Sequence, residues 1–175
     1  MNIVAFAASS STKSINKKLV SYAANLVNDA SVEILDLNDY ELPLFSADKE
    51  AELGKPDLAK QFLEKLGSSD AIMISFAEHN GSYTAAFKNL FDWCSRINPK
   101  IYQNKPMILL ATSPGARGAA TILSTAINSM PHFSGEVKGS FSLPNFYDNF
   151  DVENNEITDD ELAATLKKEV EKLYL

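Results

Sequence analysis

The fold is decided in the stretch IVAFAASSSTKSINKKL, residues 3–19, which joins an apolar run to a helical pattern through a loop rich in hydroxyl groups. We expect residues 3–8 to form a buried strand and a helix to begin at about Ile15. The first turn of a helix leaves backbone N–H groups without partners and carries a partial positive charge, so this loop can hold a phosphate. The alternative is that one serine merely caps the helix while the others face water.

The same order of strand, loop and helix recurs further along the chain. Apolar runs at residues 71–76 and 107–111 predict two more buried strands, each followed by a loop and a helical pattern. Residues 32–37 and 137–143 predict strands that carry polar side chains, which suits the edges of a sheet. Alternating strands and helices indicate a mainly parallel sheet that is covered on both sides.

These patterns predict an α/β protein with a flavodoxin-like three-layer sandwich, whose five-stranded parallel sheet has the order 2-1-3-4-5. We expect residues 1–175 to form a single domain. In such a sheet the ligand crevice lies at the carboxyl ends of the strands where the winding reverses. The loops after the first, third and fourth strands should therefore meet at one place.

Some details of the helices can also be predicted. We expect an irregular segment over residues 38–55, a helix that begins at Pro56 and ends before Gly67, and a helix capped by Ser82. The last helix should open with a capping box of Thr158 and Glu161. Asn16 falls outside the apolar face of the first helix.

Composition excludes several classes of partner. The formal net charge of −7, with scattered Lys and Arg, argues against nucleic acid. No apolar run approaches the roughly 20 residues that span a bilayer, so we expect no membrane partner. The lone cysteine, Cys94, cannot form an internal disulfide, and the first residues do not resemble a signal peptide, so we expect a cytoplasmic protein.

The first loop also excludes two common nucleotide sites. It has no glycine, so it lacks both the G-x-G-x-x-G of dinucleotide-binding proteins and the G-x-x-x-x-G-K-[ST] of nucleoside triphosphatases. A hydroxyl-lined loop suits a monophosphate instead, and riboflavin monophosphate (FMN) fits such a crevice. His79 and His132 stand far apart, no cluster has metal-ligand spacing, and no G-x-S-x-G nucleophile motif is present.

The loops resemble those of the NAD(P)H-dependent FMN reductases, a family that includes flavin, quinone and azo-dye reductases. The family's phosphate loop, G-S-x-R-x-x-S-x-N, is similar in register to residues 8–16, ASSSTKSIN. Its second loop and helix, P-E-Y-N-x-S followed by K-N-x-x-D-W, resemble residues 77–82, AEHNGS, and 88–93, KNLFDW. The third loop, S-P-G-x-x-G, is similar to residues 113–118, SPGARG.

This resemblance implies an oxidoreductase that binds FMN without a covalent bond, takes hydride from NADPH or NADH at flavin N5, and reduces a quinone, an azo compound or free flavin. No catalytic side chain and no metal are implied. Relatives commonly form dimers, and we expect a homodimer or homotetramer. The implied cofactor-binding residues lie in the three loops: Ser9, Ser11, Lys13, Ser14, Ile15 and Asn16 in the first, Ala77, Glu78, His79 and Asn80 in the second, and Ser113, Pro114 and Gly115 in the third.

The chain departs from the family pattern at four positions: Ala8 stands for Gly, Ser11 for Arg, Ala77 for Pro and His79 for Tyr. Loss of an arginine that meets phosphate costs about 1.5–3 kcal/mol, and Lys13 restores the charge without the planar fork. Two other functions therefore stay open. One is a flavodoxin-like electron carrier, and the other is a relative that has lost tight FMN binding and acts as a binding protein.

Overall fold

A parallel sheet in the order β2-β1-β3-β4-β5 forms the centre of the computed structural model, which describes residues 1–174. The predicted fold class and strand order are both confirmed. The strands of the sheet are β1 (Asn2–Ala8), β2 (Ser31–Leu35), β3 (Ala71–Phe76), β4 (Lys105–Thr112) and β5 (Gly135–Leu143). The longer helices are α1 (Ile15–Asn25), α2 (Ala47–Leu53), α3 (Asp57–Ser68), α4 (Ala85–Ile97), α5 (Ala120–Ser129) and α7 (Asp160–Glu171).

Shorter elements complete the described chain. Three are 3-10 helices: η1 (Leu37–Tyr40), η2 (Met130–Phe133) and η3 (Lys172–Tyr174). After β5 come α6 (Phe146–Asn149) and an antiparallel pair, β6 (Phe150–Asp151) and β7 (Glu156–Ile157).

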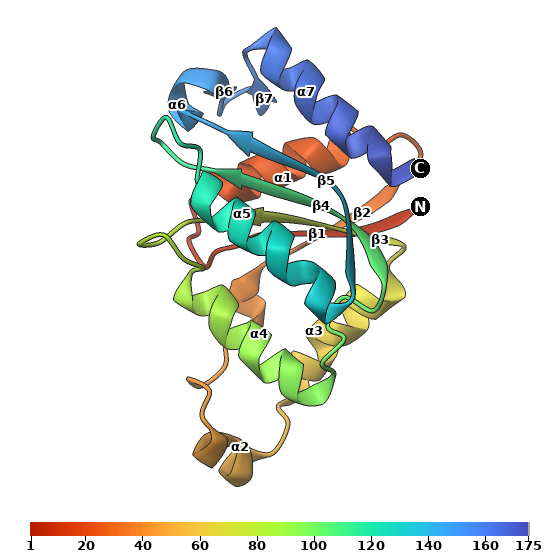
Figure 1. Ribbon diagram of the computed structural model, residues 1–175, viewed down its shortest axis with the longest axis vertical. Coiled ribbons are helices and arrows are strands. Elements are labelled where there is room, and N and C mark those ends of the chain that lie inside the picture. Colours follow the sequence, from red (N-terminus) through yellow and green to blue (C-terminus); the bar gives the residue numbers. More distant parts are fainter. Residues whose placement is uncertain (175) are drawn as a thin grey trace.

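Successive residues of each central strand enter different cores, because side chains along a strand point alternately to its two faces. Val4 and Phe6 of β1 pack in a core formed with α3, α4 and α5. Ile3 and Ala5 pack in a second core, formed with α1 and α7. Figure 1 shows the two groups of helices on opposite faces of the sheet. β3 is buried along its whole length, as its apolar run predicts.

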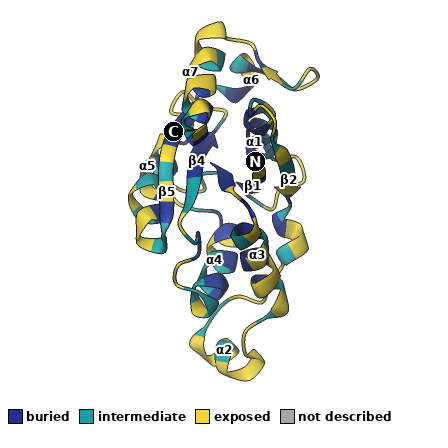
Figure 2. Ribbon diagram, turned by 90° about the vertical axis from the view of Figure 1, so that its right-hand side faces the viewer, coloured by how far each residue is buried: buried dark blue, intermediate teal, exposed yellow. Residues whose placement is uncertain are grey.

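The segment predicted to be irregular, residues 38–55, contains two helices. Asp36 caps η1 by accepting a hydrogen bond from Asn38 N (2.9 Å), and Ser46 caps α2 by accepting one from Lys49 N (3.1 Å). None of the residues of α2 is buried, and Figure 2 shows this helix at the end of the molecule, away from the sheet. Because α2 buries none of its residues, its sequence lacks the apolar spacing of a buried helix, and for this reason the helix was not predicted.

Three predicted helix ends are wrong. α4 begins after Thr84 and not after Ser82, because the backbone of Ser82 is paired with that of His79 in both directions (3.0 Å each). α3 continues through Gly67, where a Cβ would lie 2.6 Å from Gln103 Oε1, so this glycine permits close packing. Asp159, one residue after the predicted Thr158, caps α7.

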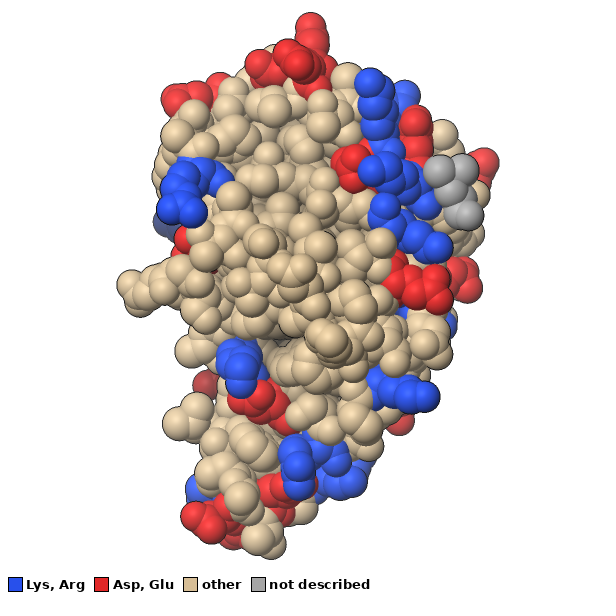
Figure 3. Space-filling view, viewed as in Figure 1, with Lys and Arg blue, Asp and Glu red and all other residues tan. Residues whose placement is uncertain are grey.

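Several surface lysines are paired with carboxylates, and Lys172, for example, is 2.6 Å from Glu169. On the face shown in Figure 3, the charged side chains of both signs lie mainly toward the edges, and the centre is uncharged. None of the described helices has the length and apolar character needed to cross a membrane.

Candidate functional site

The loops that follow β1, β3 and β4 meet at the carboxyl edge of the sheet, as the strand order predicts. They line an open cavity of about 240 Å³. All the predicted cofactor-binding residues line it except Asn80 and Gly115, which lie in the same loops but outside the lining. Thr112 and Tyr147 complete the wall, and neither was among the predicted residues.

The first loop ends in the N-terminus of α1, and its last serine has the position of a helix cap. Ser14 Oγ accepts a hydrogen bond from Lys17 N (3.2 Å), so the capping alternative is correct for this residue. The hydroxyl hydrogen of Ser14 is still available to a ligand, as are the backbone N–H groups of Ile15 and Asn16 in the first turn. The first turn contains no acidic side chain, which leaves the positive end of the helix dipole uncompensated by a carboxylate.

The side chain of Asn16 links α1 to the sheet, which the helical pattern of the sequence did not predict. Its side chain is buried (2% exposed) and connects α1 to two strands. Oδ1 accepts hydrogen bonds from Ser75 Oγ (2.7 Å) and Thr112 N (3.1 Å), and Nδ2 donates to Thr112 O (3.1 Å). The expectation that Asn16 lies outside the buried face of α1 is therefore wrong. Asn16 nevertheless remains one of the residues that line the cavity.

Lys13 supplies the positive charge of the cavity. It forms no ion pair with a carboxylate among the described residues. The neighbouring Lys17 is instead held by Asp36 at 2.6 Å, and this hydrogen bond, with that from Asn38 N, lowers the pKa of Asp36. Asp36 is thus occupied within the protein, and Lys13 is the lysine left to meet an anion at the start of α1.

The second loop is a tight turn that is hydrogen-bonded to the first turn of α5. Asn80 (φ 53°) and Gly81 (φ 72°) adopt the two positive φ values of a type I′ turn, while His79 and Ser82 pair on either side. Glu78 Oε2 accepts a hydrogen bond from Ile122 N (2.9 Å) in the first turn of α5. This carboxylate is therefore paired with a helix N-terminus, which reduces its repulsion of an anion in the cavity.

Two glycines of the third loop differ in their surroundings. Gly118 has φ +56°, and a Cβ there would lie 2.3 Å from Ser142 Oγ, so the fold requires glycine. A Cβ on Gly115 would meet no atom within 4 Å, and the fold alone does not require glycine at that position. The loop is fixed from outside, because Asn145 N donates to Gly115 O (3.0 Å) and Phe146 N donates to Ser113 O (3.1 Å).

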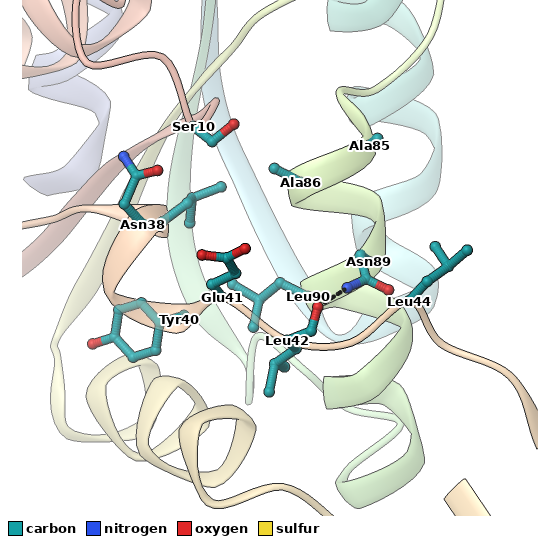
Figure 4. A pocket seen from close by; sticks show the side chains of 11 residues that line it. Ser10, Asn38, Tyr40, Glu41, Leu42, Leu44, Ala85, Ala86, Asn89 and Leu90 are labelled. Atoms are coloured by element: carbon teal, nitrogen blue, oxygen red, sulfur yellow. Dashed lines mark hydrogen bonds between the residues drawn. The ribbon is translucent and has the colours of Figure 1, made fainter. Parts of the chain in front are cut away.

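A second and larger cavity, of about 360 Å³, lies between the segment after β2 and α4 (Figure 4). Ser10 is the residue of the first loop that lines it. The charged residue that lines this larger cavity is Glu41, and its negative charge repels phosphate. The smaller cavity is therefore the better anion site. One wall is held in place by α4, because Asn89 Nδ2 donates to Leu42 O (3.0 Å) and Trp93 Nε1 donates to Pro43 O (2.7 Å).

The fold is flavodoxin-like, and the smaller cavity lies at the switch point of its sheet, where folds of this class bind their ligands. Comparison with known proteins supports this fold. FerB of Paracoccus denitrificans, described as a flavoenzyme NAD(P)H:(acceptor) oxidoreductase, has the same fold with a TM-score of 0.76 at 24% identity, over 98% of this chain and 94% of FerB. The family model described as NADPH-dependent FMN reductase matches residues 1–148. The chain belongs to this family, which consists of flavin-dependent oxidoreductases.

Curated relatives match over shorter stretches. A 2-hydroxy-1,4-benzoquinone reductase of a Burkholderia species is 33% identical over 61% of this chain and 57% of its own length. An NAD(P)H-dependent FMN reductase of Pseudomonas aeruginosa is 33% identical over 51% of this chain and 47% of its own length. The matched part thus spans about half the length of each relative. These relatives are named as reductases, so the electron-carrier alternative finds no support among them.

Proposed function

We propose that this chain is an NAD(P)H-dependent oxidoreductase that binds FMN without a covalent bond and passes hydride from NAD(P)H to a small acceptor. The observation that carries the proposal is the cavity itself. Three loops that resemble the family's motifs converge on a helix N-terminus. It has a capping serine, no acidic side chain in its first turn, and a nearby lysine, Lys13, that forms no ion pair among the described residues. The donors there suit a phosphate dianion.

The protein's own part in the reaction is binding and placement. Ser9, Ser11, Ser14 and Lys13, with the first-turn amides of Ile15 and Asn16, would hold the phosphate. Residues 78–80 and 113–115 would border the flavin ring, since Glu78, His79, Ser113 and Pro114 of these two loops line the same cavity. FMN supplies the centre that accepts and donates hydride. No side chain needs to act as a nucleophile, and burial raises the pKa of the Cys94 thiol to about 12.

Among acceptors we propose a quinone, with azo compounds and free flavin as further substrates of the same site. The relative that acts on 2-hydroxy-1,4-benzoquinone favours a quinone. We also propose a single FMN-binding domain, a cytoplasmic location and a homodimer or homotetramer. The exposed Leu44 (81%) and the unburied α2 give the chain a surface for such an assembly. Light scattering after gel filtration measures the assembly directly.

The proposed function is tested by adding FMN to the purified chain and following the quenching of flavin fluorescence. We expect binding at micromolar concentration, followed by oxidation of NADPH or NADH when a benzoquinone is added. Protein that leaves FMN fluorescence and the rate of NAD(P)H oxidation unchanged would refute the proposal.

Lys13 allows a sharper test of the same site. Lys13→Ala should weaken FMN binding about tenfold, since it removes a charge-assisted hydrogen bond, and the difference should shrink at high salt. Lys167→Ala is the matched control, because Lys167 is an exposed lysine of α7 outside the cavity lining. An unchanged affinity in Lys13→Ala would mean that hydroxyls and backbone amides suffice.

A further inference from the structure

α6 presents a large aromatic side chain to solvent at the rim of the smaller cavity. Tyr147 is 67% exposed, whereas Phe146 and Phe150 on either side are buried. Tyr147 lines the cavity beside the first loop and residues 112–114. Packing does not explain such exposure, because a tyrosine ring stabilises a fold by being covered.

The backbone that carries Tyr147 is held firmly. Phe146 N and Asn145 N donate to carbonyl groups of the third loop, at 3.1 and 3.0 Å, and Asn149 Nδ2 donates to Pro144 O (2.8 Å). The rings of Phe146 and Phe150 stack with their centroids 4.8 Å apart. Figure 1 shows α6 next to the loop that follows β4. The backbone of Tyr147 is thus held beside the cavity before any ligand arrives, so binding needs to order only the side chain.

The phenol hydroxyl of Tyr147 has no hydrogen-bond partner among the described residues, unlike those of Tyr83 and Tyr174. A phosphate dianion at the start of α1 offers several strong acceptors, and Lys13 is the one lysine or arginine of the lining. On this basis, and resting on the proposed function, we infer that Tyr147 is a cofactor-binding residue whose hydroxyl donates a hydrogen bond to the phosphate of FMN.

A hydrogen bond from Tyr147 to the phosphate can form with FMN but not with riboflavin, whereas contacts with the flavin ring can form with both. FMN and riboflavin are therefore the two probes. Riboflavin has the same ring system and ribityl chain without the phosphate. In Tyr147→Phe we expect the dissociation constant for FMN to rise about ten- to a hundredfold, the loss of one hydrogen bond to a charged group, and that for riboflavin to stay within about twofold. Both constants are measured by fluorescence quenching.

Tyr174→Phe is the matched control, because it removes an exposed phenol whose hydrogen bond, to Asn28 O (2.9 Å), lies outside the cavity. We expect it to leave both constants unchanged. Equal FMN affinity in Tyr147→Phe and the wild type would overturn the inference, and so would an equal loss for FMN and riboflavin. Failure of the wild-type chain to bind FMN would overturn the proposed function as well, so the two failures can be told apart.

Discussion

Replacing Asn16 by alanine should destabilise the protein far more than its place on a helix suggests. The side chain makes three buried hydrogen bonds, to Ser75 Oγ and to both backbone groups of Thr112. Ser75 and Thr112 are 0% and 1% exposed, so water does not readily replace the lost partner. The hydroxyl of Ser75 can rotate toward another acceptor, whereas the N–H and C=O of Thr112 stay in place.

In the variant the N–H and C=O of Thr112 are buried without hydrogen-bond partners, which costs about 1–3 kcal/mol for each group. The free energy of unfolding should therefore fall by about 2–6 kcal/mol. This is a large share of the 5–15 kcal/mol that is typical of a folded domain. The free energy of unfolding is measured from urea titration followed by circular dichroism, with the midpoint and slope compared between variants.

Asn25→Ala provides the control, because Asn25 is the exposed last residue of the same helix. Both substitutions replace asparagine by a better helix former, so propensity acts in the same direction in each. We expect Asn25→Ala to stay within about 0.5 kcal/mol of the wild type. A loss below about 1 kcal/mol in Asn16→Ala would refute the reasoning, since it would show that the three bonds do not join α1 to β3 and β4.

Three further substitutions test the third loop and the charges beside α1. Gly115→Ala should leave the unfolding temperature unchanged, because its Cβ meets open space, yet weaken FMN binding if the flavin approaches that backbone. Gly118→Ala should lower the unfolding temperature, since its positive φ and the contact with Ser142 Oγ strain any side chain, and equal melting curves for both variants would contradict this. Asp36→Asn should be less stable than the wild type near pH 7. The pKa of Asp36 is lowered in the folded state, so its stabilisation is complete above the unfolded pKa of about 3.9 and disappears as the pH falls through the folded value. Urea titrations at pH 7 and pH 3 measure this change, and a gap that widens in acid would exclude the pairing with Lys17 as its cause.

Much of the site could be predicted from the sequence because its main determinants are local. The apolar runs of β1, β3 and β4 show burial on both faces, and parallel strands bring their carboxyl ends to one edge. The convergence of the three loops follows from these two facts. The start of α1 at Ile15 was also predictable, because serine before an amphipathic run is a local signal.

Other features depend on partners that are distant in the sequence. Asn16 is polar and off the apolar stripe of α1, yet it is buried because Ser75 and Thr112 arrive from other strands with matching donors and acceptors. Ser82 has the composition of a cap but pairs with His79 across a turn. Tyr147 belongs to no motif, and nothing near it in the sequence places it at the cavity.

The sequence by itself therefore determined the layers, the strand order and the edge of the sheet at which the three loops meet, because hydrophobic periodicity and the geometry of parallel strands are carried by each segment alone. The tertiary structure decided how the side chains at that edge are used. It assigned Asn16 and Glu78 to internal hydrogen bonds, left Lys13 free of any carboxylate among the described residues, and brought Tyr147 to the rim. Such assignments depend on which groups meet across the fold, and hydrogen bonds between distant segments leave no periodic trace in the sequence.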